Sequence, residues 1–297
     1  MNEAAVAQPA SIEQLFVYPV KSLRGSAVAQ CEVRATGLAG DREWMIVRPD
    51  GRFVSQRELP RLATLGAAAI EGGLLRMDAD GQAPLLVPYA CPGGAEFDST
   101  VWGDRCVVTD AGAEATRWLG AALDPPWPCR LVRMREGFVR RLEREALLGQ
   151  GTSTWFADAA PLLVVNLASL VALNERLTAN GRAPVGIERF RPNIVVRGPA
   201  AFAEHTIATL RAQPGSLRLC YPCERCVVIT IDQCSGVRDR QTNEPFRTLA
   251  GLNTTPGRPG KPVFGVNAVW QGTSRILRVG EHLSAEPANG STAEARQ

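Results

Sequence analysis

Histidine and lysine are scarce in this chain of 297 residues. The two histidines are His205 and His282, and the two lysines are Lys21 and Lys261. With so few histidines, a multi-histidine metal site or a Cys–His nucleophile pair is hard to assemble. Arginine supplies most of the basic charge, and its planar fork suits phosphate and carboxylate groups. Lys21 therefore stands out as a position that uses a compact ammonium group.

Long apolar segments and a large excess of either charge are also missing. No segment of 18 apolar residues is present, and residues 1–10 lack the basic start and apolar stretch of a signal peptide. With 33 basic against 30 acidic residues, the net charge of +3 is too balanced to predict binding to nucleic acid or to a membrane surface. We therefore expect a cytoplasmic monomer that contacts neither a membrane nor nucleic acid.

Short apolar runs separated by Gly, Pro and Asp turns fill residues 11–110, and this pattern predicts strands and hairpins. Residues 114–123 have the spacing of a short helix that ends at the proline-rich stretch 124–128. Later apolar runs predict strands at 160–166, 190–196 and 264–270, and a helix at 167–177. The predicted class is mostly β with a few helices (α+β). We expect disordered tails at 1–10 and 286–297, with one domain at 11–128 and a second at 129–285.

A run of three cysteines, Cys220-Tyr-Pro-Cys223-Glu-Arg-Cys226, is the strongest candidate for chemistry. The chain has eight cysteines, which in a reducing cytosol are more often buried small residues or ligands than disulfides. The composition of Val227–Asp232, which is β-branched up to Ile231, predicts a strand after the run. We expect the run to form an irregular loop that presents the Cys226 thiolate, backed by Arg225, to a cleft.

Four interpretations of the run compete. An iron–sulfur cluster or a four-cysteine zinc site needs a further ligand, and the nearest candidate is Cys234. If residues 227–232 are extended, Cys234 lies roughly 25 Å from Cys226 at about 3.3 Å per residue, too far for a shared cluster. Two interpretations stay open on the residues alone. Either all these cysteines are buried thiols, or one thiolate, Cys226, is a ligand or nucleophile.

Three polar stretches lie beside predicted strand ends. Each alone is more often a set of solvated charges than a site. Together they supply the arginine forks, the ammonium, the hydroxyl and the amide that a phosphate-bearing anionic cofactor needs. The candidate residues are Lys21 and Ser22, Arg42, and Arg191 with Asn193.

These motifs, taken in order, resemble those of MOSC proteins that carry the accompanying N-terminal β-barrel domain. Similar members include the mitochondrial amidoxime-reducing component and its bacterial counterparts. The resemblance covers about residues 11–285 and rests on nine motifs: YPVKSLRG, GDREWMIV, FVSQRELPRL, VWGDRCVVTDAG, LLVVNLASLVALN, ERFRPNIVV, PCERCVVITID, KPVFGVNAV and ILRVGEHL.

The resemblance implies two β-barrel domains and a molybdenum cofactor, with molybdenum held by molybdopterin and one protein cysteine. By motif, that metal ligand is Cys226, and Asp158 lies near the metal as a second catalytic residue. Five residues match positions that line the pterin and its phosphate: Lys21, Ser22, Arg42, Arg191 and Asn193. Two departures are visible. Glu224 replaces a small residue, and Ala159 with Ala160 replaces more polar ones.

The activity that the resemblance implies is reduction of N-hydroxylated compounds, namely amidoximes and N-hydroxylated bases. Electrons would come from a separate donor protein of the ferredoxin, cytochrome b5 or flavin reductase type, because no ferredoxin cysteine set follows the last predicted strand. The alternative is a non-catalytic carrier of sulfur or molybdenum cofactor that uses Cys226 as a persulfide thiol. Pyridoxal phosphate binding is associated with the family through its sulfurases, and no pyridoxal-phosphate desulfurase domain is recognisable here.

Overall fold

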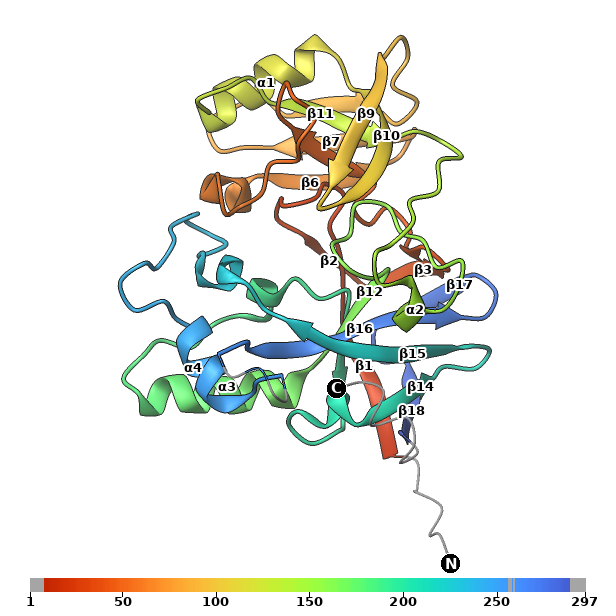
Figure 1. Cartoon of the computed structure of the whole chain (residues 1–297), viewed down its shortest axis with the longest axis vertical. Helices are drawn as coiled ribbons and strands as arrows, with labels where there is room; N and C mark the ends of the chain where they lie inside the picture. Colours follow the sequence, from red (N-terminus) through yellow and green to blue (C-terminus); the bar gives the residue numbers. More distant parts are fainter. Residues whose placement is uncertain (1–7, 256–257, 259, 289–297) are drawn as a thin grey trace, which may run out of the picture.

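The computed structural model describes residues 8–255, 258 and 260–288. Figure 1 shows two lobes: an upper one of strands and one helix, and a lower one in which two helices lie beside long strands. The α-helices are α1 (Ala113–Leu123), α2 (Glu145–Leu148), α3 (Leu167–Ala179) and α4 (Phe246–Leu252). Short 3-10 segments are η1 (Pro60–Thr64), η2 (Ile187–Phe190), η3 (Ala203–His205) and η4 (Val227–Thr230). Among the described residues, no helix is long and apolar enough to cross a membrane.

The lower lobe is a closed barrel of seven strands. Their order is β13-β12-β16-β15-β14-β18-β1, and pairing of β1 with β13 closes the ring. All neighbours are antiparallel except β12 and β13. The strands are β1 (Gln8–Val17), β12 (Leu162–Asn166), β13 (Ile194–Arg197), β14 (Ile207–Arg211), β15 (Ser216–Glu224), β16 (Val263–Gln271) and β18 (His282–Pro287). Closure leaves no unpaired edge, which is one solution to the edge-strand problem of sheets.

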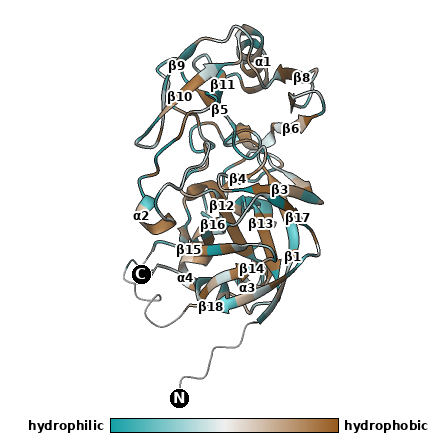
Figure 2. Ribbon diagram, turned by 90° about the vertical axis from the view of Figure 1, so that its right-hand side faces the viewer, coloured by the Kyte–Doolittle hydropathy of each residue, from teal (hydrophilic) through white to brown (hydrophobic). Residues whose placement is uncertain are grey.

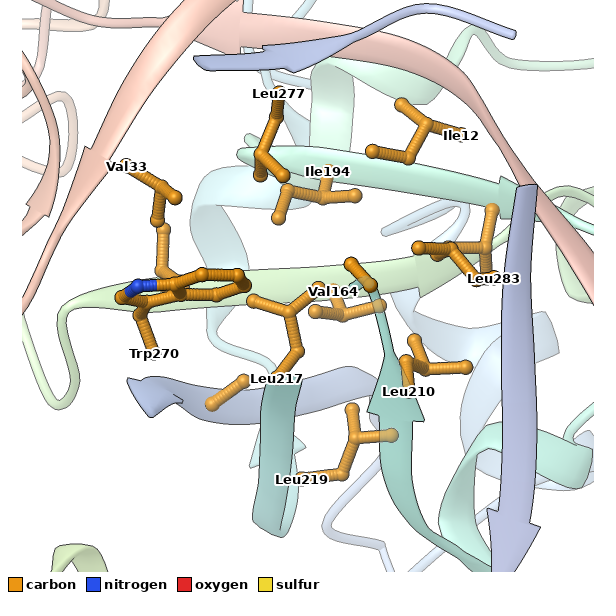
Figure 3. Packing of buried hydrophobic residues seen from close by; sticks show 14 of the residues in the cluster. Ile12, Val33, Val164, Ile194, Leu210, Leu217, Leu219, Trp270, Leu277 and Leu283 are labelled. Atoms are coloured by element: carbon orange, nitrogen blue, oxygen red, sulfur yellow. The ribbon is translucent and has the colours of Figure 1, made fainter. Parts of the chain in front are cut away.

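The barrel interior is filled by aliphatic side chains and one tryptophan. Figure 3 shows Val164, Ile194, Leu217, Trp270 and Leu283 converging from five strands. Burying one such aliphatic side chain contributes roughly 1.5–3 kcal/mol, so this cluster stabilises the barrel. Figure 2 shows hydrophobic stretches on the strands of both lobes.

The upper lobe contains two antiparallel sheets with α1 packed against them. One has the order β5-β11-β10-β9 and the other β6-β7-β8. A third small sheet, β17-β3-β4, joins a C-terminal strand to N-terminal ones. The strands of these three sheets are β3 (Gln30–Arg34), β4 (Gly37–Leu38), β5 (Trp44–Val47), β6 (Gly66–Ile70), β7 (Leu74–Asp78), β8 (Leu85–Pro88), β9 (Glu96–Val101), β10 (Asp104–Asp110), β11 (Arg130–Met134) and β17 (Arg275–Arg278). β2 (Ser26–Val28) instead pairs with β1 as an eighth strand beside the barrel.

The predicted mostly β class is confirmed, as are the two predicted helices, which are α1 and α3. The structure differs at the predicted domain ends because strand pairing crosses them. β1 starts at Gln8 and pairs with β18, which runs to Pro287, so residues 8–10 and 286–287 are ordered strand instead of tail. The other residues of the predicted tails lie outside the described ones, apart from residue 288.

The predicted domain division between residues 128 and 129 remains a prediction. In the structure, one strand from each side of this division lies in the lobe formed mainly by the other side. β1 lies in the barrel built from C-terminal strands. β11, which follows residue 128, hydrogen-bonds to β5 and β10 of the upper lobe. Each predicted domain therefore contributes one strand to the lobe built mainly by the other.

A carboxyl group is buried beneath the barrel where α3 begins. The Asn166 side chain caps this helix by accepting from the Ala168 N–H. One turn in, the Ser169 hydroxyl donates to the Glu204 carboxyl at 2.8 Å, and Glu204 is 1% exposed. Burial raises the pKa of Glu204 to about 7.

This raised pKa predicts that Glu204 makes the protein less stable as pH rises. The unfolded carboxyl ionises near pH 4.5, whereas the native one keeps its proton until about pH 7. The native state therefore binds more protons in this window, and stability falls with pH. As pH rises from 5 to 8, the free energy of unfolding of Glu204→Gln minus that of wild type should increase by about 2 to 3 kcal/mol.

Urea unfolding of both proteins at several pH values measures this gain. The buried neighbour His205, whose pKa burial lowers to about 4, titrates in both proteins and cancels in the difference. A difference between the two proteins that is constant over this pH range would show that native Glu204 ionises normally.

Candidate functional site

A cleft of about 370 Å³ brings together all seven residues selected from the sequence motifs. Its walls come from residues 21–57 and Trp102, from 144–163, from 190–193, and from 221–228. Six lining side chains are cationic and two are anionic: Lys21, Arg42, Arg57, Arg144, Arg191 and Arg225 against Asp158 and Glu224. Such an excess of one sign in a concave site favours anionic ligands.

Lys21 follows the end of β1 and points into the protein. Its backbone N–H donates to the Trp44 carbonyl at 2.8 Å, which fixes the chain at this point. Its Nζ donates to the Phe156 carbonyl at 2.8 Å and to Asp158 Oδ1. Lys21 is 5% exposed, and this burial lowers its pKa while the Asp158 carboxylate opposes the change. Because a buried ammonium needs such partners, Lys21 and Asp158 depend on each other.

Asp158 faces the cleft from the segment that precedes β12, and 65% of its side chain is exposed. Oδ1 accepts from Lys21 Nζ and also from the indole N–H of Trp102 at 3.1 Å. In the described chain no side chain donates to Oδ2. Partial removal from water raises the pKa of Asp158, but the Lys21 ammonium and the Trp102 N–H hold it well below its usual range. Asp158 is therefore an ionised acceptor with one oxygen open to the cleft.

Arg42 is the centre of a buried network. Its Nη1 donates to Asp41 Oδ2 at 2.7 Å and to Asn193 Oδ1 at 3.1 Å. Its Nη2 donates to the Arg191 carbonyl at 3.1 Å. The Asn193 oxygen also accepts from the Leu163 N–H at 3.1 Å. Asn193 thus holds Arg42 and β12 in register, and its amide oxygen is already occupied by protein donors.

Two guanidinium groups share one aromatic ring. Arg42 lies 4.2 Å and Arg191 4.4 Å from the Tyr18 ring centroid, within cation–π range. The side chain of Arg191 donates to the Leu23 carbonyl at 2.6 Å. Burial and the neighbouring Arg42 charge lower the pKa of Arg191 to about 10. An anion bound beside this pair would relieve that repulsion.

Four of the cleft residues have left-handed backbone conformations although none is glycine. The φ angles are 71° at Ser22, 49° at Arg42, 57° at Trp102 and 55° at Arg191. Such conformations cost of order 1–3 kcal/mol each and persist only where the surrounding structure enforces them. Their clustering around one cleft supports a functional role for it.

The cysteine run differs from its predicted backbone. Residues 216–224 form strand β15, which therefore contains Cys220 and Cys223. The predicted strand after Cys226 is wrong, because Val227–Thr230 is the 3-10 segment η4. There the Thr230 hydroxyl donates to the Val227 carbonyl at 2.7 Å, and Ile229 is buried against α3 and α4. Tertiary burial thus overrides the β propensity of these residues.

The distance argument against a cluster that includes Cys234 loses its basis, since the chain after Cys226 is not extended. Among the described residues, however, no three His, Cys, Asp or Glu side chains are grouped so that they could hold a metal ion. Cys226 is exposed and lines the cleft, as predicted from its position after Arg225.

Arg225 supports a different thiol from the one predicted. Its Nη1 donates to Cys223 Sγ at 3.0 Å and its Nη2 to the Phe190 carbonyl at 2.7 Å. Its backbone N–H donates to the Pro262 carbonyl at 2.8 Å. The prediction that Arg225 backs Cys226 is therefore wrong, since the side chain turns toward the strand. Cys226 is left as the exposed thiol at the cleft.

The two departures from the family pattern both lie in the cleft wall. Glu224 accepts from Arg258 Nη1 and faces Thr255, so its carboxylate is paired at the edge of the cleft. The Ala159 carbonyl accepts from the Tyr221 hydroxyl at 3.0 Å, and Ala160 is buried. At positions 159 and 160, packing takes the place of polar side chains.

Sequence reasoning missed several residues of the cleft wall. They include Phe53, Gln56, Arg57, Trp102, Arg144 and Tyr221. Phe53, Gln56 and Arg57 belong to the FVSQRELPRL motif, and Trp102 to VWGDRCVVTDAG. The motifs were therefore visible, but nothing in the local pattern distinguishes a side chain that faces the cleft from one that faces solvent.

Comparison with known families gives two matches along the chain. Residues 9–126 match the MOSC N-terminal beta barrel domain, and residues 151–284 match the MOSC domain. Together these matches include every residue of the cleft discussed above except Arg144.

Known relatives match over most of the chain. Mitochondrial amidoxime reducing component 2 of Rattus norvegicus is 32% identical over 82% of this chain and 72% of its own length. Mitochondrial amidoxime-reducing component 1 of Homo sapiens is 31% identical over 92% of this chain and 82% of its own length. Molybdenum cofactor sulfurase of Danio rerio is 29% identical over 92% of this chain, but this chain spans only 34% of that protein.

Proposed function

The chain belongs to the MOSC family, and from that premise we propose that it binds a molybdenum cofactor at Cys226 and reduces N-hydroxylated compounds with it. Its relatives link the family to the molybdenum cofactor and include proteins named as amidoxime-reducing components. The single observation that supports the proposal best is the cleft itself. It gathers an exposed thiol, paired arginines and an ionised carboxylate.

The residues of the cleft fit a cofactor that carries a phosphate and its own sulfur ligands. Arg42 and Arg191 repel each other beside Tyr18, so a phosphate placed next to them would be stabilised. Lys21 adds a point charge and Ser22 a hydroxyl. The thiolate of Cys226 would be a soft ligand, suited to a metal that already bears sulfur. Asn193 would act indirectly, by orienting Arg42.

When bound, this cofactor supplies two-electron reduction of an N–O bond. The protein contributes binding and orientation. Asp158 Oδ2 is the open acceptor in the cleft and can receive an N–H or O–H of an amidoxime. Because Asp158 stays ionised beside Lys21, it accepts a hydrogen bond from the substrate and does not donate a proton to it. Net reduction also consumes two protons, and the exposed side of Asp158 is in contact with solvent that can supply them.

The proposal includes a separate electron-donor protein of the ferredoxin, cytochrome b5 or flavin reductase type. It also includes a monomeric state and a location in the cytoplasm, while the relatives quoted above are named as mitochondrial. Copurification with candidate donors and cell fractionation test these parts separately from the chemistry.

The central test is purification from a molybdate-supplied host that makes the cofactor. We expect molybdenum equimolar with the chain and reduction of benzamidoxime when a chemical reductant replaces the donor. Zinc or iron in place of molybdenum would contradict the cofactor assignment. Loaded protein that never turns over would instead favour a carrier of sulfur or cofactor with Cys226 as the persulfide thiol, a function suggested by the similarity to the sulfurase.

A further inference from the structure

An exposed tryptophan stands at the mouth of the cleft. Trp102 is 47% exposed, and of the large exposed hydrophobic side chains in the described residues it is the one that lines the cleft. It belongs to the two-residue loop between β9 and β10, the hairpin that points from the upper lobe toward the lower one in Figure 1. A tryptophan with a purely structural role would bury more of its indole, because burial of apolar surface stabilises the fold.

The backbone at Trp102 also points to a role for the side chain. Its φ is 57°, in the left-handed region, and it is the first residue of its hairpin loop. Two-residue loops of this kind favour glycine or asparagine at such positions. Gly103 follows directly, yet the tryptophan occupies the strained position. Bulky residues with a strained backbone conformation are often found at functional sites.

Contacts hold the indole in one orientation. Its N–H donates to Asp158 Oδ1 at 3.1 Å, next to the Lys21 ammonium. Phe53 meets it edge to face, with ring centroids 5.0 Å apart and planes at 75°. The Arg57 guanidinium lies 4.3 Å from its ring centroid. The ring is thus oriented before any ligand arrives, with its N–H at the carboxylate of Asp158.

We propose that Trp102, with Arg57, is a stacking platform that gives the cleft a preference for N-hydroxylated substrates carrying an aromatic or heteroaromatic ring. This inference rests on the proposed function and deepens it. A ring lying on the uncovered indole surface places its attached N–O group on the side of Asp158. An aliphatic amidoxime has the same reacting group but gains nothing from the platform.

Binding without turnover is the first test. Equilibrium dialysis of benzamidoxime and acetamidoxime against cofactor-loaded, oxidised protein separates ring recognition from chemistry. Stacking of one ring is worth about 1–3 kcal/mol, so Trp102→Ala should weaken benzamidoxime binding about tenfold or more. Acetamidoxime binding should change less than roughly twofold, because no ring stacks. Trp102→Phe keeps a ring and should bind benzamidoxime within about threefold of wild type.

The phenylalanine variant also removes the indole N–H from Asp158, and Trp102→Ala does the same. If both variants weaken both ligands equally, Trp102 acts only through Asp158 and the platform is overturned. Unchanged binding of benzamidoxime in Trp102→Ala overturns it as well. Because Trp102 is half exposed on a hairpin loop, both variants should fold, which thermal unfolding checks.

Steady-state kinetics then distinguish the two proposals. The platform predicts that Trp102→Ala raises KM for benzamidoxime about tenfold while kcat stays within about twofold. Wild-type protein that binds benzamidoxime through Trp102 but reduces neither substrate would sink the reductase proposal and leave the platform standing. Wild-type protein that reduces both substrates, with KM values that do not depend on Trp102, would sink the platform alone.

Discussion

Replacing Cys226 by serine is expected to remove molybdenum from the purified protein and to abolish reduction of benzamidoxime. The thiol is exposed at the cleft, and the described residues contain no group of three or more His, Cys, Asp or Glu side chains that could hold a metal by themselves. A serine hydroxyl is a harder and far less acidic ligand than a thiol, so it does not replace thiolate on a sulfur-bound metal. Metal analysis and the reductase assay on the same preparation give the two readouts.

Two cysteine variants make the control informative. Cys234→Ser changes an exposed thiol that does not line the cleft and should behave as wild type. Cys223→Ser changes the thiol that accepts from Arg225, and it should retain most of the metal. Molybdenum retained by the Cys226→Ser protein would refute the ligand assignment. Loss in Cys223→Ser together with retention in Cys226→Ser would transfer that role to the thiol beside Arg225.

The residues selected from the sequence come together in one cleft, whereas parts of the local backbone were predicted wrongly. Lys21, Arg42 and Arg191 were selected because cations beside strand ends suit an anionic ligand, and the fold gathers them in one cleft. The left-handed φ angles of Ser22, Arg42 and Arg191 could not be predicted, because only tertiary contacts select such conformations for residues other than glycine.

Errors in the sequence-based prediction arose where tertiary burial overrode local preference. Val227–Thr230 has the composition of a strand but forms a 3-10 turn that buries Ile229. Arg225 precedes Cys226 in sequence, yet its side chain turns toward Cys223, because neighbours along a chain seldom point the same way. Trp102 was part of a recognised motif, but its place in the cleft depends on the lower lobe that it contacts.

Substitution of Arg42 should cost the protein several kcal/mol of stability, because it breaks a buried ion pair. Its side chain is 11% exposed and that of Asp41 is 3% exposed. Arg42→Met keeps much of the volume but leaves the Asp41 carboxylate buried without its partner and removes the donors to Asn193 and Arg191. Removing one member of a buried ion pair typically costs 3–5 kcal/mol. In a protein of this size we expect the thermal midpoint to fall by roughly 10 °C.

The matched control is an exposed ion pair of the same type. Arg52 and Asp50 pair at 2.7 Å, but their side chains are 68% and 48% exposed. Since water screens such pairs, Arg52→Met should cost less than about 1 kcal/mol. Differential scanning calorimetry of the three proteins compares the two losses directly. Equal losses would mean that the network around Arg42 is no better held than a surface pair. A much larger loss at Arg42 ties stability to the same arginine that is proposed to bind the phosphate, because one buried network fixes both.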